Sequence, residues 1–279
     1  MLPIDWESWK YFKRNKLSML GGLYLLSMII VSIYPPLFSP HDPWEHSFKP
    51  LSPPNFENWF GTDQMGRDIF SRVVWGARAS FLIALIAVCV STFFGTMVGI
   101  LSGYAGGKID YLAMRLTDTV IVMPSFFIYI VIITAMRIQS ATLIAVVMGF
   151  VMWTRVAKIV RSEVLSLKQR EFVIMTKAMG ANISRIVLRH LLPNTLSSVI
   201  VVATVNMGHA VLSIAGLGFL GLGDPSSLDW GTQLLWGRNL IRNSWWCAIF
   251  PGLALLGASL SMNVLGDGLR DALDPKLRR

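Results

Sequence analysis

Six long apolar segments constrain the fold of this chain more than any other feature of its sequence. Each is free of Asp, Glu, Lys and Arg and is long enough to cross about 30 Å of hydrocarbon at about 1.5 Å per helical residue. Charged residues make up 15% of the chain, against about 25% in an average soluble domain. The solvent around such a chain is therefore a lipid bilayer. The predicted spans are 17–38, 79–107, 119–136, 138–154, 191–223 and 243–266.

The buried part of each span must be helical, because an open strand would leave backbone N–H and C=O groups without partners in lipid. The chain is therefore predicted to be an all-α integral membrane protein with six transmembrane helices. Basic residues precede the first span, but its apolar run is too long for a cleaved signal peptide, and five more spans follow. A single residue, Arg137, separates the third and fourth spans, which predicts a tight helical hairpin with this arginine at the lipid headgroups.

The distribution of basic residues predicts the orientation of the spans. The chain has 25 Lys and Arg, 16 Asp and Glu, and a net charge of +9. With both termini in the cytoplasm, eighteen of the 25 basic residues lie inside and seven outside, as the positive-inside bias requires. Membrane orientation thus accounts for the positive charge, and we expect no nucleic-acid partner. The predicted divisions are a cytoplasmic segment 1–16, a first span 17–38, an external loop 39–78, a five-helix core 79–266 and a cytoplasmic tail 267–279.

Two external stretches are predicted to carry short interfacial helices. In the loop 39–78, prolines first prevent a regular helix, and then Ile69, Val73 and Gly76 follow at helical spacing with arginines around the same axis. This spacing predicts an amphipathic helix at the membrane surface ahead of the second span. After the fifth span, the segment 230–241 is predicted to form another short helix, with Trp230 and Trp236 in the aromatic belt.

The internal stretch 155–190 is the most informative part of the sequence. It begins as a charged extension of the fourth span and continues into a short amphipathic segment that Gly180 ends in a left-handed conformation. Asn182 is predicted to cap the next helix, and Pro193 to mark the return to the membrane. Helices in a bundle are usually joined by about two to eight residues. A connection this long, with its own helix-turn-helix, is typical of a surface that binds a partner rather than of a plain connector.

Few polar side chains lie within the spans. Asn206 and His209, three residues apart, share one face of the fifth span, where they either line a transport pathway or make a hydrogen bond between helices. Arg115 and Asp118, also three apart, are expected to pair with each other. Glycines at every fourth position of the second span predict close packing of another helix, within the bundle or from a second subunit. These glycines are Gly95, Gly99, Gly103 and Gly107.

The sequence predicts no enzyme site. The GLGFLG run at 216–221 matches a dinucleotide fingerprint, but no strand precedes it and it ends a membrane helix. The phosphate-binding GxxxxGK[ST], the zinc-binding HExxH and the nucleophilic GxSxG motifs do not occur. Cys89 and Cys247 have no neighbouring Cys or His and are expected to be core side chains rather than a disulfide or metal pair. We therefore expect the chain to bind no metal or cofactor of its own.

Several segments nevertheless resemble one transporter family. The run REFVIMTKAMGANISRIVLRHLLPN, in which Gly180 is followed by Leu192-Pro193, is similar to the EAA loop of binding-protein-dependent ABC importer permeases. Four further segments resemble, in chain order, the second, C-type permease subunit of the dipeptide, oligopeptide and nickel branch. They are FGTDQMGRDIFSRVVWGARASF, MRLTDTVIVMPSF, GFLGLGDPSSLDWG and LGDGLRDALDPKLRR. One departure is that Ile174-Met175-Thr176 stands where the family has Glu-Ala-Ala.

The resemblance implies that the internal loop is the coupling segment that docks on a cytoplasmic ATPase subunit. An apolar face of Phe172, Met175 and Met179, with Lys177 at its rim, suits docking of a helix in a groove. The implied partners are a second homologous permease subunit, two ATPase subunits that hold ATP and magnesium, and an extracytoplasmic solute-binding protein. The implied location is the bacterial or archaeal plasma membrane, the inner membrane in a Gram-negative cell. The coupling residues would be Glu171, Phe172, Met175, Thr176, Lys177, Ala178, Met179, Gly180 and Ala181.

The resemblance leaves the cargo open among short peptides, nickel and metal chelates. The run NMGHAVLSIAGLGFLGLG, with His209, is closer to the nickel-type members, and imidazole suits nickel, so the sequence slightly favours metal over peptide. The implied mechanism is alternating access, in which ATP binding closes the ATPases and the coupling helices reorient the spans. The competing hypothesis is a self-contained six-helix secondary transporter or channel, which would need a carboxylate at mid-membrane or paired broken helices, and neither is evident.

Overall fold

Five helices in residues 16–273, the part of the chain that this computed structural model describes, are long and apolar enough to cross a membrane. They are α2 (Lys16–Ile33), α3 (Ile69–Ala105), α6 (Ala141–Leu167), α9 (Leu192–Phe219) and α11 (Trp246–Leu273). A sixth candidate span is a pair of helices, α4 (Gly107–Val122) and α5 (Ser125–Ala135), bent by 88°. The predicted all-α membrane fold is confirmed. Of the predicted cytoplasmic ends, 1–15 and 274–279 lie outside the described residues.

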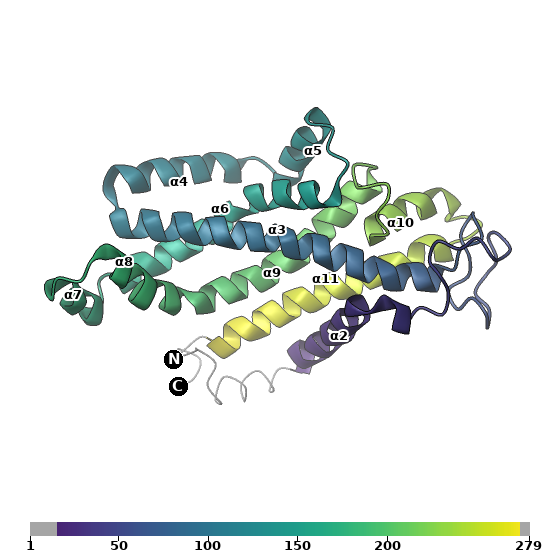
Figure 1. Ribbon diagram of the computed structural model, residues 1–279, viewed down its shortest axis with the longest axis horizontal. Helices are drawn as coiled ribbons and strands as arrows, with labels where there is room; N and C mark the ends of the chain where they lie inside the picture. The colour runs from purple at the N-terminus through teal and green to yellow at the C-terminus, as the bar shows by residue number, and fades with distance from the viewer. Residues whose placement is uncertain (1–15, 274–279) are drawn as a thin grey trace.

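The short elements gather at the two ends of the bundle (Figure 1). The internal stretch forms α7 (Glu171–Ala178), α8 (Ile183–Ile186) and the π-helical turn η2 (Val187–Leu191) at one end. The opposite end holds η1 (Pro35–Leu37), the loop that follows it, α10 (Trp230–Gly237) and η3 (Arg238–Leu240). The stretches predicted to be internal and external thus lie at opposite ends, as opposite sides of a membrane require. Which end faces the cytoplasm stays a prediction from the charge distribution.

The most extensive helix contact in the described residues joins α3 to α6, and glycines make it possible. A Cβ on Gly99 would lie 2.7 Å from the carbonyl oxygen of Ala157 and 2.7 Å from the Cβ of Val160, so no larger residue fits without displacing α6. Gly95 and Gly103 meet Val156 and Val164 in the same way. The predicted close packing therefore occurs within this chain. The expectation for Gly107 was wrong, because Gly107 and Gly106 have positive φ angles and form the turn between α3 and α4.

The separate amphipathic helix predicted before the second span does not exist. α3 starts at Ile69 and runs on without a break, so Ile69 and Val73 are buried against the bundle instead of resting on a membrane surface. Asp68 caps this helix, since its Oδ2 accepts hydrogen bonds from the backbone N–H and the hydroxyl of Ser71, at 2.8 and 2.7 Å. The cap satisfies an amide at the first turn and fixes where the chain enters the long helix.

Trp230 is a core residue and not the belt residue that the sequence predicted. It is fully buried at the start of α10, and its indole N–H donates to the carbonyl of Val73 at 3.0 Å. Beside it, Gln233 donates to the carbonyl of Arg72 at 2.7 Å, and the site of a Cβ on Gly76 is filled by the Trp230 and Gln233 side chains. The short helix forms as predicted, but it packs against α3, because the Trp230 and Gln233 side chains donate hydrogen bonds to backbone carbonyls of that helix.

The third span is broken rather than continuous from 119 to 136. Met123 adopts an extended conformation ahead of Pro124, and a residue before proline is disfavoured in helical geometry. The chain therefore turns sharply between α4 and α5. The hairpin predicted between the third and fourth spans is present between α5 and α6, and Arg137 is exposed at its turn with a φ of 50°.

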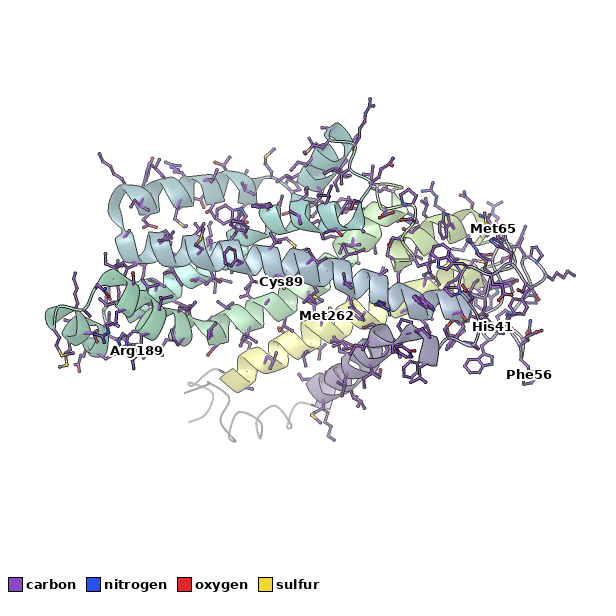
Figure 2. The ribbon with its side chains drawn as sticks, viewed as in Figure 1. His41, Phe56, Met65, Cys89, Arg189 and Met262 are labelled. Carbon is purple, nitrogen blue, oxygen red and sulfur yellow. The ribbon has the colours of Figure 1, made fainter. Side chains whose placement is uncertain are left out.

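Two cysteines and two methionines differ in how far they are buried. Met148 and Met262 lie in the core, and Cys247 is buried as expected. The expectation for Cys89 was wrong, because this side chain is exposed on α3 (Figure 2). Both cysteines are free. Pro193 lies in the first turn of α9, directly after η2, and its place at the return to the membrane stays a prediction.

Replacing Gly99 with leucine is expected to push α3 away from α6. Forcing extra methylenes into a packed helix contact typically costs about 1–3 kcal/mol. The thermal unfolding midpoint of the purified assembly in detergent should fall for Gly99→Leu. Cys89→Leu adds similar bulk to an exposed face of the same helix and should leave the midpoint near the wild-type value. Equal midpoints for both variants would contradict the packing described here.

Candidate functional site

The tip formed by α7 is fixed to the bundle by one buried side chain. Val173 is 3% exposed and packs in a cluster with Leu167 at the end of α6 and with Ile186 and Leu191 ahead of α9. Glu171 lies in the first turn of α7 and Lys177 in the last, so both charges oppose the helix dipole favourably. The tip is thus held by the ends of two long helices, α6 and α9.

The outer side of α7 presents exposed apolar side chains, of which Phe172 also makes a ring contact with His190. Phe172, Met175 and Met179, the residues of the predicted docking face, are exposed, with Met179 at 79%, and docking there stays a prediction. Ile174 is also exposed, although the sequence analysis did not include it in this face. Soluble surfaces rarely expose apolar groups in such a cluster unless a partner covers them. We call Phe172, Ile174, Met175 and Met179 the tip face.

The turn after α7 has the geometry that the sequence predicted. Gly180 has a φ of 78°, its N–H donates to the carbonyl of Lys177 at 3.0 Å, and the N–H of Ala181 donates to that of Thr176 at 3.3 Å. This is the hydrogen-bond pattern of a Schellman motif, in which glycine is favoured. Asn182 then caps α8, accepting from the N–H of Arg185 at 3.2 Å, as predicted.

A second candidate site is a cavity of about 490 Å³ between α5, α6 and α9. Asn206 and His209 both line it, which confirms that they share one face of their helix. His209 is exposed to the cavity side, whereas Asn206 is 2% exposed and its Nδ2 has no hydrogen-bond partner. Tyr129 of α5 and Arg155 of α6 complete the polar part of the lining.

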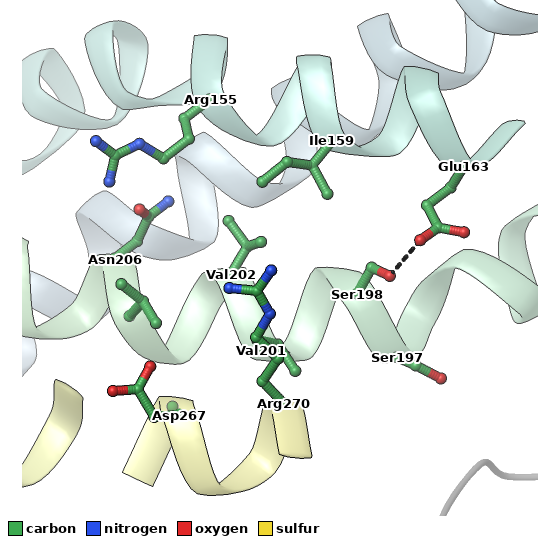
Figure 3. Close-up of a pocket in the computed structure, with 12 residues that line it drawn as sticks. Arg155, Ile159, Glu163, Ser197, Ser198, Val201, Val202, Asn206, Asp267 and Arg270 are labelled. Atoms are coloured by element: carbon green, nitrogen blue, oxygen red, sulfur yellow. Dashed lines mark hydrogen bonds between the residues drawn. The ribbon is translucent and has the colours of Figure 1, made fainter. Parts of the chain in front are cut away.

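An adjoining cavity of about 480 Å³ extends from this one toward the end that carries α7. It shares Arg155, Ile159 and Asn206 with the first cavity, and Figure 3 shows Arg155 on α6 facing Asn206 on α9. Further along, the Oε1 of Glu163 accepts a hydrogen bond from the hydroxyl of Ser198 at 2.9 Å. The facing walls of α6 and α9 therefore carry polar groups at both ends of this cavity, with Ile159, Val201 and Val202 between them.

The charged residues near these cavities are paired in an unexpected way. The Nζ of Lys158 lies 2.6 Å from the Oδ1 of Asp118, so the expected Arg115–Asp118 pair was wrong. Arg115 instead donates to the hydroxyl of Tyr111, because α4 packs along α6 and turns Asp118 toward that helix. Arg161 donates to Asp110 at 2.6 Å across the same contact.

Arg155 is the functional candidate that the sequence analysis missed. Span boundaries drawn at the first charged residue end the fourth span at Thr154, which assigns Arg155 to the cytoplasmic stretch. In the structure it lies in the middle of α6 and beside the cavity. One signal was available in the sequence. The segment before the fourth span offers two acidic residues, Asp110 and Asp118, which pair with Arg161 and Lys158 and leave none for Arg155.

Two family models match this chain. Residues 95–279 match the binding-protein-dependent transport system inner membrane component, and residues 6–54 match the N-terminal transmembrane domain of oligopeptide transport permease C.

Curated relatives match over nearly the whole chain. The dipeptide transport system permease protein DppC of Alkalihalophilus pseudofirmus is 39% identical over 98% of this chain and 90% of its own length. The oligopeptide transport system permease protein OppC of Bacillus subtilis is 37% identical over 96% and 88%. The glutathione transport system permease protein GsiD of Escherichia coli is 37% identical over 98% and 90%. These matches set aside the self-contained secondary transporter or channel. The chain belongs to the binding-protein-dependent transport system inner membrane components, as a multi-pass plasma membrane permease subunit of an ABC importer, of the C type.

Proposed function

We propose that this chain forms half of a peptide pathway through the membrane and is driven by cytoplasmic ATPases that grip α7. The observation that carries the proposal is the tip face, an exposed apolar surface held by the ends of α6 and α9. A helix of eight residues with an exposed apolar side has the form of a helix that docks in a groove. The second half of the pathway would come from a homologous permease subunit.

The proposed coupling is mechanical. Val173 joins α7 to Leu167 and Leu191, so a displacement of the docked tip is carried into α6 and α9. These are the helices whose facing sides line the two cavities, and moving them would alternate access between the two sides of the membrane. ATP and magnesium would be held by the two partner ATPase subunits, and cargo would arrive from an extracytoplasmic solute-binding protein. This chain would perform no covalent chemistry.

We propose short peptides as the cargo, in place of the metal that the sequence slightly favoured. The relatives described above are named for dipeptide, oligopeptide and glutathione transport, and each of those solutes contains peptide bonds. The wall of the cavity adds a second argument, because Arg155 places a positive charge there. A positive wall disfavours a free metal cation and favours a solute that carries a carboxylate.

Met179→Asp is expected to uncouple ATP hydrolysis from import. A charge on the tip face would have to be buried in the apolar groove of the ATPase, which is unfavourable without a partner. Import should fall by about tenfold or more while the amount of protein in the membrane stays unchanged. Gln139→Asp, at the exposed turn between α5 and α6, is the matched control and should import normally. Normal import by Met179→Asp would count against docking at α7.

The cargo is tested by the ATPase turnover of the purified importer. The assembly of both permeases, both ATPases and the solute-binding protein should be stimulated by a short peptide such as dialanine. Free nickel ions should not stimulate it, because the positive wall attracts a carboxylate and repels a cation. Stimulation by nickel with no response to any of a panel of peptides would reverse the proposed cargo.

His209→Ala is expected to lower peptide uptake by about three- to tenfold without preventing assembly, if the exposed imidazole contacts cargo in the cavity. Thr204→Ala is a matched control on the same helix, because its hydroxyl bonds to the carbonyl of Ile200 in its own helix. Uptake by His209→Ala equal to that of the control would assign His209 to packing alone.

A further inference from the structure

We propose that Arg155 and Asn206 bind the free carboxylate of the cargo on the wall of the pathway between α6 and α9. This inference rests on the peptide import proposed above and names the part of the peptide that the wall recognises. Two donor groups on two different helices face each other there (Figure 3). A carboxylate between them would accept hydrogen bonds from both.

Arg155 is an arginine in the middle of a helix that is long and apolar enough to span the membrane. It lies about 21 Å along α6 from the first residue of that helix, at about 1.5 Å per residue. Among residues 16–273 it makes no hydrogen bond or ion pair, although Lys158, one turn further, is neutralised by Asp118. A charged side chain at this depth is expensive to keep and is by default functional. Its guanidinium is a planar fork that matches the geometry of a carboxylate.

Asn206 supplies the second, independent observation. Its side chain is 98% removed from solvent, yet the Nδ2 donor has no hydrogen-bond partner in the described residues. A buried donor without an acceptor is unfavourable, and native proteins rarely leave one. The amide lines both cavities and faces Arg155, so a single acceptor group placed between the two side chains would satisfy both of them.

The remaining charges around the site leave its positive charge uncompensated. Glu163 and Asp267 line the adjoining cavity, but neither lies within ion-pair distance of Arg155. The hydroxyl groups of Ser125, Tyr129 and Ser213 line the first cavity and can donate further hydrogen bonds. At about 490 Å³ the space falls in the range of small-molecule sites, about 300–1,000 Å³. The site therefore suits the carboxyl end of a short peptide.

The test compares dialanine with its C-terminal amide, which lacks only the negative charge. The complete importer in proteoliposomes, with both permeases, both ATPases and the solute-binding protein, takes up each labelled probe. For Arg155→Gln, dialanine uptake should fall at least about tenfold, equivalent to about 1.4 kcal/mol. Uptake of the amide should stay within about twofold of wild type. Arg155→Lys keeps the charge and should retain part of the dialanine uptake.

Lys158→Gln is the matched control, because Lys158 lines the same cavity and is already paired with Asp118. It should change the uptake of both probes by the same factor. Equal losses of both probes in Arg155→Gln would overturn the proposal and assign Arg155 to a structural ion pair with the second permease subunit. If the wild type takes up dialanine and the variant loses both probes equally, the proposed function still stands. If the wild type takes up neither probe, both the carboxylate site and the proposed peptide import are wrong.

A solute-binding protein that rejects the amide would hide the difference, so binding is measured as well. The permease–ATPase assembly in nanodiscs, without the solute-binding protein, is titrated with each probe. Arg155→Gln should weaken dialanine binding at least about tenfold and leave binding of the amide unchanged. If Arg155→Gln does not weaken dialanine binding more than binding of the amide, the carboxylate site is overturned. If Arg155→Gln does not assemble, Asn206→Ser and Arg155→Lys serve in the same comparison.

Discussion

The close contact between α3 and α6 is the interaction on which the arrangement of the other helices depends. Lipid tails are as apolar as the side chains, so no hydrophobic force brings two helices together inside a membrane. Close approach of the backbones must supply the attraction, and the glycines at 95, 99 and 103 permit it because α3 has no Cβ at these three positions. Val156, Val160 and Val164 fill the resulting grooves and are almost fully buried. α6 is thereby fixed along its length, and so are the cavity wall and the tip that it carries.

The charged groups of α6 are then paired one by one with the elements packed around it. Lys158 and Arg161 bind carboxylates of α4, Lys168 donates to the carbonyl of Gly103 at 2.9 Å, and Glu163 accepts from Ser198. An unpaired charge in low-dielectric surroundings is costly, and these partners remove that cost. Within the described residues, Arg155 has no hydrogen-bond or ion-pair partner, and the Nδ2 of Asn206 has no hydrogen-bond partner. Two neighbouring exceptions on facing helices indicate a function rather than imperfect packing.

The sequence predicted those features of the fold and the site that depend on neighbouring residues, and it missed those that depend on contacts between distant parts of the chain. Helix caps at Gly180 and Asn182 are local, because the residue type and its immediate neighbours determine the turn, and both were predicted correctly. The burial of Trp230 depends on a hydrogen bond to Val73, 157 residues earlier, and no periodicity within α10 reveals it. The position of Arg155 was missed for a related reason: a helix can carry an arginine into the membrane when a facing helix offers a polar cavity.

The two proposed sites are joined by the same pair of helices. α6 carries Arg155 and ends at Leu167, about 18 Å further along at about 1.5 Å per residue, where it contacts Val173 of the tip. α9 carries Asn206 and is preceded by Leu191, which contacts the same cluster. A partner that displaced α7 would therefore act on both walls of the proposed carboxylate site at once. Since Arg155 and Asn206 can hold one carboxylate only while they face each other, separating α6 from α9 would release the cargo in the same movement that opens the pathway.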